Sequence, residues 1–255
     1  MGCCGSKSGG SGADRTARWR LTGIVALRDA KLKALPSEVL EVDTFVRTLD
    51  LTNNRIVEIH PEISKLINMQ RLVLARNLIE RLPTTMGNLR SLKLTICFCS
   101  LVCYLSRLER LSITGNSLTC LPKAIGDMHN LLLLNVSNNK LKSIPESIGG
   151  CISLEEFQAN DNSIEVLPPS ICNLVHLKSL LLNSNNIQQL PQNLLRDCKA
   201  LQNISLHDNP ISMEQFQQME GFQEFEARRK KKFDKQIDSN VMLSSTGLDE
   251  GVDLR

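Results

Sequence analysis

A leucine-rich motif that returns about every 23 residues limits the folds open to this chain. The template is L-x-x-L-x-L-x-x-N-x-L-x-x-L-P, and the regular copies begin 23 residues apart, with one final step of 24. Copies begin at Val46, Met69, Leu108, Leu131, Leu154, Leu177 and Leu201, and a weaker opening copy without the asparagine runs from Ile24 to Pro36. A fixed period of this length is typical of a solenoid.

Each part of the motif predicts a structural element. The L-x-L core alternates with period two, which predicts a short strand with its leucines on one side. Stacked copies would pair these strands into a parallel sheet, and the following L-P-x-x-I-x-x-L predicts short helical segments on the outer face. We therefore expect an α/β fold: a right-handed solenoid, or horseshoe, with a concave parallel sheet and a C-terminal capping helix.

The asparagine of each copy is expected to have a structural role. It follows the strand, where its amide can donate to and accept from backbone groups that would otherwise be buried unpaired. The predicted repeat ladder consists of Asn54, Asn77, Asn116, Asn139, Asn162, Asn185 and Asn209.

One interval departs from the period. Only 39 residues separate Met69 from Leu108, where two regular copies need about 46. Residues 92–107 contain neither a ladder asparagine nor L-P. Two interpretations stay open: a degenerate repeat or looped-out segment, and a splice or gene-model irregularity. On either one we expect this turn to pack poorly, because it lacks the buried leucines of a regular copy.

The repeats over residues 22–213 resemble the leucine-rich-repeat family, with about eight to nine copies. The L-P ending and the 23-residue period are similar to the intracellular Ras-group-related, Sur-8-like type. With the small size and the amino-terminal signal described below, the chain most resembles leucine-rich repeat-containing protein 57 and its plant relatives. The resemblance implies a small GTPase as partner, with a protein phosphatase or kinase as an equal alternative.

The amino terminus carries a lipidation signal. Met1 to Ser6 match M-G-x-x-x-[ST], which marks Gly2 for myristoylation, and Cys3 and Cys4 are candidate palmitoylation sites. One acyl chain gives only marginal membrane binding, so a second chain and basic residues would make it durable. The basic residues are Lys7, Arg15, Arg18 and Arg20. We expect residues 1–21 to be a flexible lipidated anchor on the cytoplasmic face of a membrane, with the plasma membrane as first candidate.

The exposed positions around each L-x-L are the candidate partner-binding residues. They are Arg47, Arg55, Arg71, Arg76 and Arg110 in the early copies and Glu155, Glu156, Asp161 and Lys178 in the later ones, with Asp50, Gln158, Asn183 and His207 beside them. A basic end would grade into an acidic middle and orient a partner by charge complementarity. The competing interpretation is that solvent-facing strand residues are polar in any case.

After Asn209 the repeat ends, and residues 214–238 are predicted to form the capping helix. Its apolar residues recur every three positions and would cover the core of the last repeat; they are Phe216, Met219, Phe222 and Phe225. The basic run 228–232 could touch anionic lipid, act as a nuclear-localisation signal, or be a solvated helix face balanced by glutamates. Residues 239–255 are expected to be disordered.

The remaining features argue against other classes of function. A formal net charge of +3 on 255 residues is too small for a nucleic-acid binder. Nine cysteines without a secretory signal predict reduced thiols, and Cys97, Cys99 and Cys103 lack a second metal-ligand pair. The sequence holds no catalytic motif, so we expect no enzyme, metal or cofactor. The leading hypothesis is a monomeric membrane-tethered scaffold, and the alternative is a cytosolic or nuclear adaptor.

Overall fold

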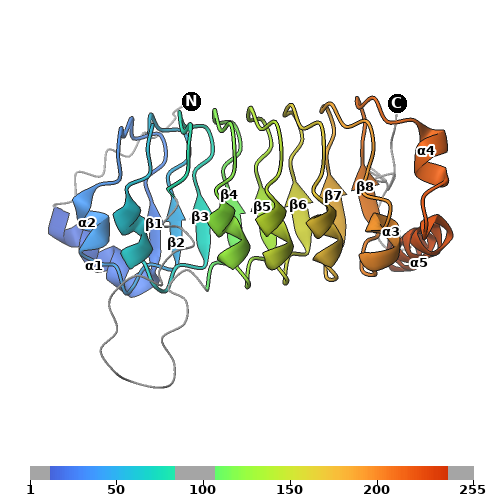
Figure 1. Cartoon of the computed structure of the whole chain (residues 1–255). Helices are drawn as coiled ribbons and strands as arrows, with labels where there is room; N and C mark the ends of the chain where they lie inside the picture. The colour runs from blue at the N-terminus through green and yellow to red at the C-terminus, as the bar shows by residue number, and fades with distance from the viewer. Residues whose placement is uncertain (1–11, 84–106, 241–255) are drawn as a thin grey trace, which may run out of the picture.

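The computed structural model describes residues 12–83 and 107–240. Eight strands in that part of the chain form one parallel sheet, in chain order from one end to the other (Figure 1). The strands are β1 (Ile24–Ala26), β2 (Thr48–Asp50), β3 (Arg71–Val73), β4 (Arg110–Ser112), β5 (Leu133–Asn135), β6 (Glu156–Gln158), β7 (Ser179–Leu181) and β8 (Asn203–Ser205). The predicted solenoid is thereby confirmed.

Short helices form a second row along one side of the sheet (Figure 1). They are α2 (Ser37–Leu40), the 3-10 helices η1 (Pro61–Lys65), η3 (Lys123–Asp127), η4 (Glu146–Gly150) and η5 (Pro169–Asn173), and α3 (Leu194–Asp197). A proline begins or directly precedes each of the first five, where its fixed φ suits a helix start. The row is tightly stacked, since a Cβ on Gly150 would lie 2.3 Å from the carbonyl oxygen of Gly126.

The hydrophobic core lies between the sheet and these helices. The central residue of every strand is fully buried, and the strand register places these residues side by side. They are Val25, Leu49, Leu72, Leu111, Leu134, Phe157, Leu180 and Ile204. Burying one such side chain contributes about 1.5–3 kcal/mol, and each turn obtains that burial only from its neighbours.

The ladder asparagines bind backbone groups of two adjacent turns. Asn185 Nδ2 donates to the carbonyl of Leu182 in its own turn at 3.0 Å and to that of Ala159 in the preceding turn at 2.9 Å. Its Oδ1 accepts from the N–H of Ile164 at 3.0 Å. The same three contacts recur at Asn54, Asn77, Asn116, Asn139, Asn162 and Asn209. These amides pair groups that burial would otherwise leave unsatisfied.

The irregular interval does not break the sheet. β3 pairs directly with β4, with Arg71 opposite Arg110, which leaves no place for a further strand between them. The ladder also crosses the interval, because Asn116 accepts from the N–H of Ile79 at 3.1 Å and donates to the carbonyl of Leu74 at 3.0 Å. The predicted poor packing of residues 92–107 lies outside the described residues, except for Arg107.

The amino-terminal end differs from the flexible segment predicted for residues 1–21. Residues 1–11 lie outside the described part of the chain, but Gly12–Thr22 form helix α1. Trp19 is buried in the core, and the guanidinium of Arg15 lies 5.3 Å from the centroid of its ring. Arg15 also forms an ion pair with Glu38 of α2. Helix α1 therefore covers the end of the core that β1 alone would leave open.

Two helices, rather than the single helix predicted for residues 214–238, cap the carboxyl end (Figure 1). They are α4 (Met213–Gln217) and α5 (Phe222–Asn240). Phe216 packs edge-on against Phe222 and Phe225, with ring centroids 5.6 and 6.0 Å apart. Helix α5 includes residues 239 and 240, which the sequence predicts to be disordered, and residues 241–255 lie outside the described ones.

One member of the basic run 228–232 has a structural role. Arg228 donates from Nε to the carbonyl of Leu201 at 3.0 Å and from Nη2 to the carbonyl of Leu195 at 2.9 Å. Both carbonyls belong to the last turn of the solenoid, so no following repeat supplies a hydrogen-bond donor for them. Lys230 and Lys231 of the same run are exposed.

Within the described residues, the helices include none that is long and apolar enough to cross a bilayer.

Candidate protein-binding surface

The face of the sheet turned away from the short helices is open. Its side chains stand on either side of the buried central residue of each strand and align in two rows, which we call the open face. From β2 to β8 the first row is Thr48, Arg71, Arg110, Leu133, Glu156, Ser179 and Asn203, and the second is Asp50, Val73, Ser112, Asn135, Gln158, Leu181 and Ser205. The predicted alternation of the L-x-L core is therefore what creates this surface.

The basic end of the open face consists of Arg71 and Arg110, with Arg47 one residue before β2. Arg71 and Arg110 stand directly opposite each other on β3 and β4. All three side chains are exposed, and none forms an ion pair or side-chain hydrogen bond with another described residue. Like charges directly opposite on neighbouring strands destabilise a sheet. The basic end is thus well suited to a ligand that supplies carboxylate or phosphate groups.

The acidic middle of the open face is partly neutralised within the molecule. Gln158 Nε2 donates to Glu156 Oε1 at 2.5 Å, and Asn135 Nδ2 donates to Gln158 Oε1 at 2.5 Å. Glu155, just before β6, forms an ion pair with Lys178 at 2.8 Å. The structure therefore brings together two residues that the sequence analysis treats as separate partner contacts. An exposed pair of this kind adds little stability of its own.

The amide end of the open face, near the carboxyl terminus, consists of Ser205 in the second row and of Asn160 and Asn183, which stand two residues after β6 and β7. Asn183 Oδ1 accepts from Ser205 Oγ at 2.7 Å and from the N–H of His207 at 2.9 Å. Asn160 Oδ1 accepts from the N–H of Asn183 at 2.9 Å. These bonds join successive turns, as the ladder does, so the polar side chains of the amide end are already used in hydrogen bonds within the protein. The spacing of 23 residues between Asn160 and Asn183 is the signal that could have found the contact.

Asp50 is an acidic member of the open face whose charge is already compensated. Its Oδ2 accepts from Arg28 Nε at 2.7 Å, and its Oδ1 accepts from Thr52 Oγ1 at 2.6 Å. Burial raises the pKa of this carboxyl, but the hydrogen bonds from Arg28 and Thr52 outweigh burial and hold the pKa below its ordinary value. Arg28 could not be placed from the sequence, because the opening copy lacks the asparagine that would fix its register.

Three predicted partner-binding residues lie at the rim rather than on the open face. Arg76 and Asp161 have positive φ angles of 54° and 53° in the turns after β3 and β6, and Arg55 follows the ladder asparagine Asn54. The positive φ turns the chain out of the sheet, so these exposed side chains leave the two rows. A partner resting on the basic end could still reach Arg76 from the side.

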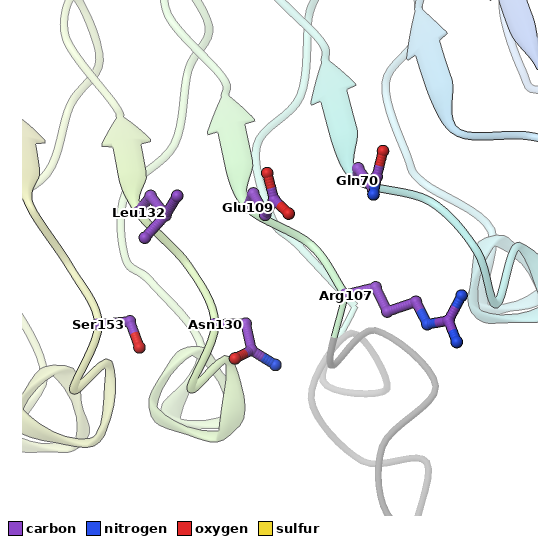
Figure 2. Close-up of a pocket in the computed structure, with 6 residues that line it drawn as sticks. All are labelled: Gln70, Arg107, Glu109, Asn130, Leu132 and Ser153. Carbon is purple, nitrogen blue, oxygen red and sulfur yellow. The ribbon is translucent and has the colours of Figure 1, made fainter.

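A shallow hollow of about 410 Å³ lies where β3, β4 and β5 begin. Figure 2 shows Gln70, Glu109 and Leu132 at the strand starts and Arg107, Asn130 and Ser153 in the loops before them. Arg107 Nη1 donates to Asn68 Oδ1 at 2.9 Å. The described side chains that line the hollow form no acid–base pair with a role in catalysis, so we assign no ligand to it.

Two of the described cysteines, Cys151 and Cys198, are buried and structural in character. Burial raises the pKa of Cys151 and of Cys198 to about 12, so both thiols stay protonated and unreactive at neutral pH. Among the described residues, no group of three or more His, Cys, Asp or Glu side chains could hold a metal ion. Cys97, Cys99 and Cys103 lie outside the described residues, as do the predicted lipidation sites Gly2, Cys3 and Cys4.

Solved leucine-rich-repeat structures share the fold. Internalin C2 from Listeria monocytogenes str. 4b F2365 matches with a TM-score of 0.63 over 81% of each chain, at 17% identity, which is a likeness of fold alone. The plant peptide hormone receptor RGFR1, solved in complex with RGF2, matches with a TM-score of 0.60 at 27% identity. That match covers 73% of this chain and 28% of the receptor chain.

Sequence comparison identifies the family. The leucine rich repeat family model matches residues 45–97 and 106–164. Plant intracellular Ras-group-related LRR protein 7 from Oryza sativa subsp. japonica is 66% identical over 261 residues, which span the whole of both chains. The resemblance drawn from the L-P ending and the 23-residue period is therefore confirmed, and the chain belongs to the plant intracellular Ras-group-related leucine-rich-repeat proteins.

Proposed function

We propose that this protein is a membrane-tethered scaffold of intracellular signalling that binds a protein partner on the open face of its sheet. The observation that carries the proposal is the basic end, where Arg71 and Arg110 face each other without a counter-ion among the described residues. Such a pair costs stability in the free protein and gains from an acidic partner surface. Members of the leucine-rich-repeat family act as protein-interaction modules, which agrees with this role.

The partner class we propose is a Ras-type small GTPase, with a phosphatase or kinase as the alternative. The support is the Ras-group-related family of the rice relative and the polarity of the open face, which runs from basic to amide-rich. Charge complementarity of this kind fixes the orientation of a partner and speeds its encounter. A GTPase surface rich in carboxylates would therefore be expected to cover β3 and β4 rather than β7 and β8.

The membrane tether rests on the lipidation signal at Gly2, Cys3 and Cys4. Myristate on Gly2 would supply reversible membrane affinity, and acylation of either cysteine would make it durable. Arg18 and Arg20 on α1, whose side chains form no ion pair with another described residue, add positive charge after the anchor segment. A scaffold held in this way would raise the local concentration of its partner at the membrane surface.

Proximity labelling in cells tests both parts, with the labelling enzyme fused at the carboxyl end so that Gly2 stays free. The wild type is compared with Gly2→Ala and with the double variant Arg71→Glu, Arg110→Glu. A matched control, Lys140→Glu with Lys142→Glu, makes the same charge change on exposed lysines outside the open face. We expect membrane neighbours to depend on Gly2, and one acidic partner to be lost only in the arginine variant.

Two outcomes would contradict the proposal. If wild type and Gly2→Ala label the same cytosolic or nuclear neighbours, the tether is idle and the protein is a soluble adaptor. If the arginine variant and the lysine control lose the same neighbours, the basic end is not the binding surface.

A further inference from the structure

Three of the exposed large hydrophobic side chains gather at the amino-terminal end of the solenoid. Leu21 is 87% exposed, and Ile24 and Phe45 are 53% and 50% exposed. The backbone segments that carry them meet at Gly23, which lies against the second turn: its carbonyl accepts from the N–H of Arg47 at 2.8 Å, and a Cβ on it would lie 3.0 Å from the carbonyl oxygen of Phe45. The result is an apolar surface at the junction of α1, β1 and the start of β2.

The orientation of α1 places positive charge around this surface. Trp19 is buried, and at about 100° per residue Leu21 lies roughly 200° around the helix from it, so Leu21 points away from the core. Arg18 and Arg20 flank Leu21 and are exposed, and neither forms an ion pair with another described residue. Asp14 is the one acidic residue of the helix. The outward side of α1 is therefore an apolar tip between two guanidinium groups.

An anionic lipid surface fits this arrangement. Guanidinium groups bind phosphate oxygens strongly, and the apolar side chains of an interfacial helix enter the boundary between headgroups and acyl chains. Gly12, the first residue of α1, is ten positions after Gly2, a segment that spans at most about 35 Å when extended. An acyl chain on Gly2 would therefore keep α1 within reach of the bilayer.

We propose that Leu21, Ile24 and Phe45, with Arg18 and Arg20, form an N-terminal patch that binds anionic phospholipid headgroups and holds the α1 end of the solenoid against the membrane. The proposal rests on the membrane tether of the proposed function and adds a second, non-covalent contact to it. It also orients the scaffold, because the opposite end, capped by α4 and α5, is then directed away from the bilayer (Figure 1).

Vesicle sedimentation of the full chain, without acyl chains on its amino terminus, tests the patch. The protein carries Gly2→Ala, Cys3→Ser and Cys4→Ser so that no acyl chain contributes, and the vesicles contain phosphatidylcholine with or without phosphatidylserine. We expect binding only when phosphatidylserine is present. Emission of Trp19, the only tryptophan of the chain, checks that α1 remains docked in every variant.

Two pairs of variants separate the patch from general attraction. Arg18→Ala with Arg20→Ala should weaken binding about 30-fold, whereas Lys140→Ala with Lys142→Ala, which removes the same charge elsewhere, should weaken it far less. Leu21→Gln should weaken binding about fivefold, whereas Leu78→Gln, at a site with 53% exposure, should leave it unchanged.

The patch proposal is overturned if phosphatidylserine does not increase binding of the chain to the vesicles, which would be the result if residues 1–11 or a second copy covered Leu21. It is also overturned if each control weakens binding as much as its patch variant. Neither result bears on the lipid tether, which is tested separately by the Gly2→Ala comparison in cells. If the chain binds the vesicles but Gly2→Ala leaves the cellular neighbours unchanged, the tether is contradicted and the patch is supported.

Discussion

The two ends of the open face use polar residues in opposite ways. At the amide end, Asn160 and Asn183 hold the N–H groups and hydroxyls of the following turns. At the basic end, Arg71 and Arg110 stand opposite each other, and their side chains have no hydrogen-bonding partner in the described part of the chain. Ser179 and Asn203 occupy the row of Arg71 and Arg110 at the amide end, and Asn203 Nδ2 donates to Ser179 Oγ at 3.2 Å. The same row thus serves cohesion between turns at one end and remains available for a ligand at the other.

This difference shows how a regular repeat can carry a local function. Every regular turn needs its leucines and its ladder asparagine, because they bury and pair groups of the neighbouring turns. The two open-face positions of a strand are not needed for this burial and pairing, so they can hold residues that are unfavourable in the free protein. Polar residues bonded between turns should therefore affect stability, and the unbonded arginines should affect binding.

The largest expected effect comes from a polar residue that the fold uses fully. Asn185→Ala removes four hydrogen bonds and leaves the buried N–H of Ile164 without a partner, whereas the carbonyls of Ala159 and Leu182 keep the bonds from Asn162 and Asn209. We expect a loss of about 3 kcal/mol in the free energy of unfolding, measured by urea denaturation. Asn186→Ala, at the exposed neighbouring position, should change it by less than about 0.5 kcal/mol; equal losses would contradict the ladder's role.

A smaller, pH-dependent effect is expected at Asp50. The pKa of this carboxyl lies below its ordinary value in the folded protein, so its charge stabilises the fold at neutral pH and the gain is lost as pH falls through the folded pKa. Asp50→Asn should therefore lower the free energy of unfolding by about 1–2 kcal/mol near pH 7. The difference should shrink below about pH 4. A difference that is the same at both pH values would mean that ionisation of Asp50 contributes nothing.

The smallest effect, with the opposite sign, is expected at the basic end. Arg110→Glu turns a repulsive pair with Arg71 into an attractive one and should raise the free energy of unfolding by about 0.3–0.5 kcal/mol at low salt. The gain should fade as ionic strength rises. Arg110→Gln, which only removes the repulsion, should give about half of it. A clear loss of stability in either variant would show that Arg110 has a structural role after all.

The regular part of this fold could be predicted from the sequence. The positions of the strands and the ladder follow from one period, because a residue and its neighbour in the next turn are 23 positions apart. The same rule would have found the ion pair of Glu155 with Lys178, which stands at that spacing. The family follows from the same pattern, since the L-P ending recurs in five of the eight copies.

The parts that depend on the ends of the solenoid could not be predicted in this way. Helix α1 forms because Trp19 finds the uncovered core beside β1, and Arg228 reaches two carbonyls that the last turn leaves open. Neither contact recurs from turn to turn, so the 23-residue period does not predict it. The pairing of Arg28 with Asp50 could not be predicted for the same reason, because Arg28 belongs to the degenerate first copy.

Site-specific crosslinking in cells tests the central claim most directly. A photoactivatable amino acid is placed at Ser112, beside the two arginines, or at Leu181, which occupies the same strand position three strands further along. We predict a crosslink to a discrete protein partner from position 112, lost when Arg71 and Arg110 are both changed to Glu, and none from position 181. Equal crosslinks from both positions, or a crosslink only from 181, would contradict the division of the open face into a binding end and a structural end.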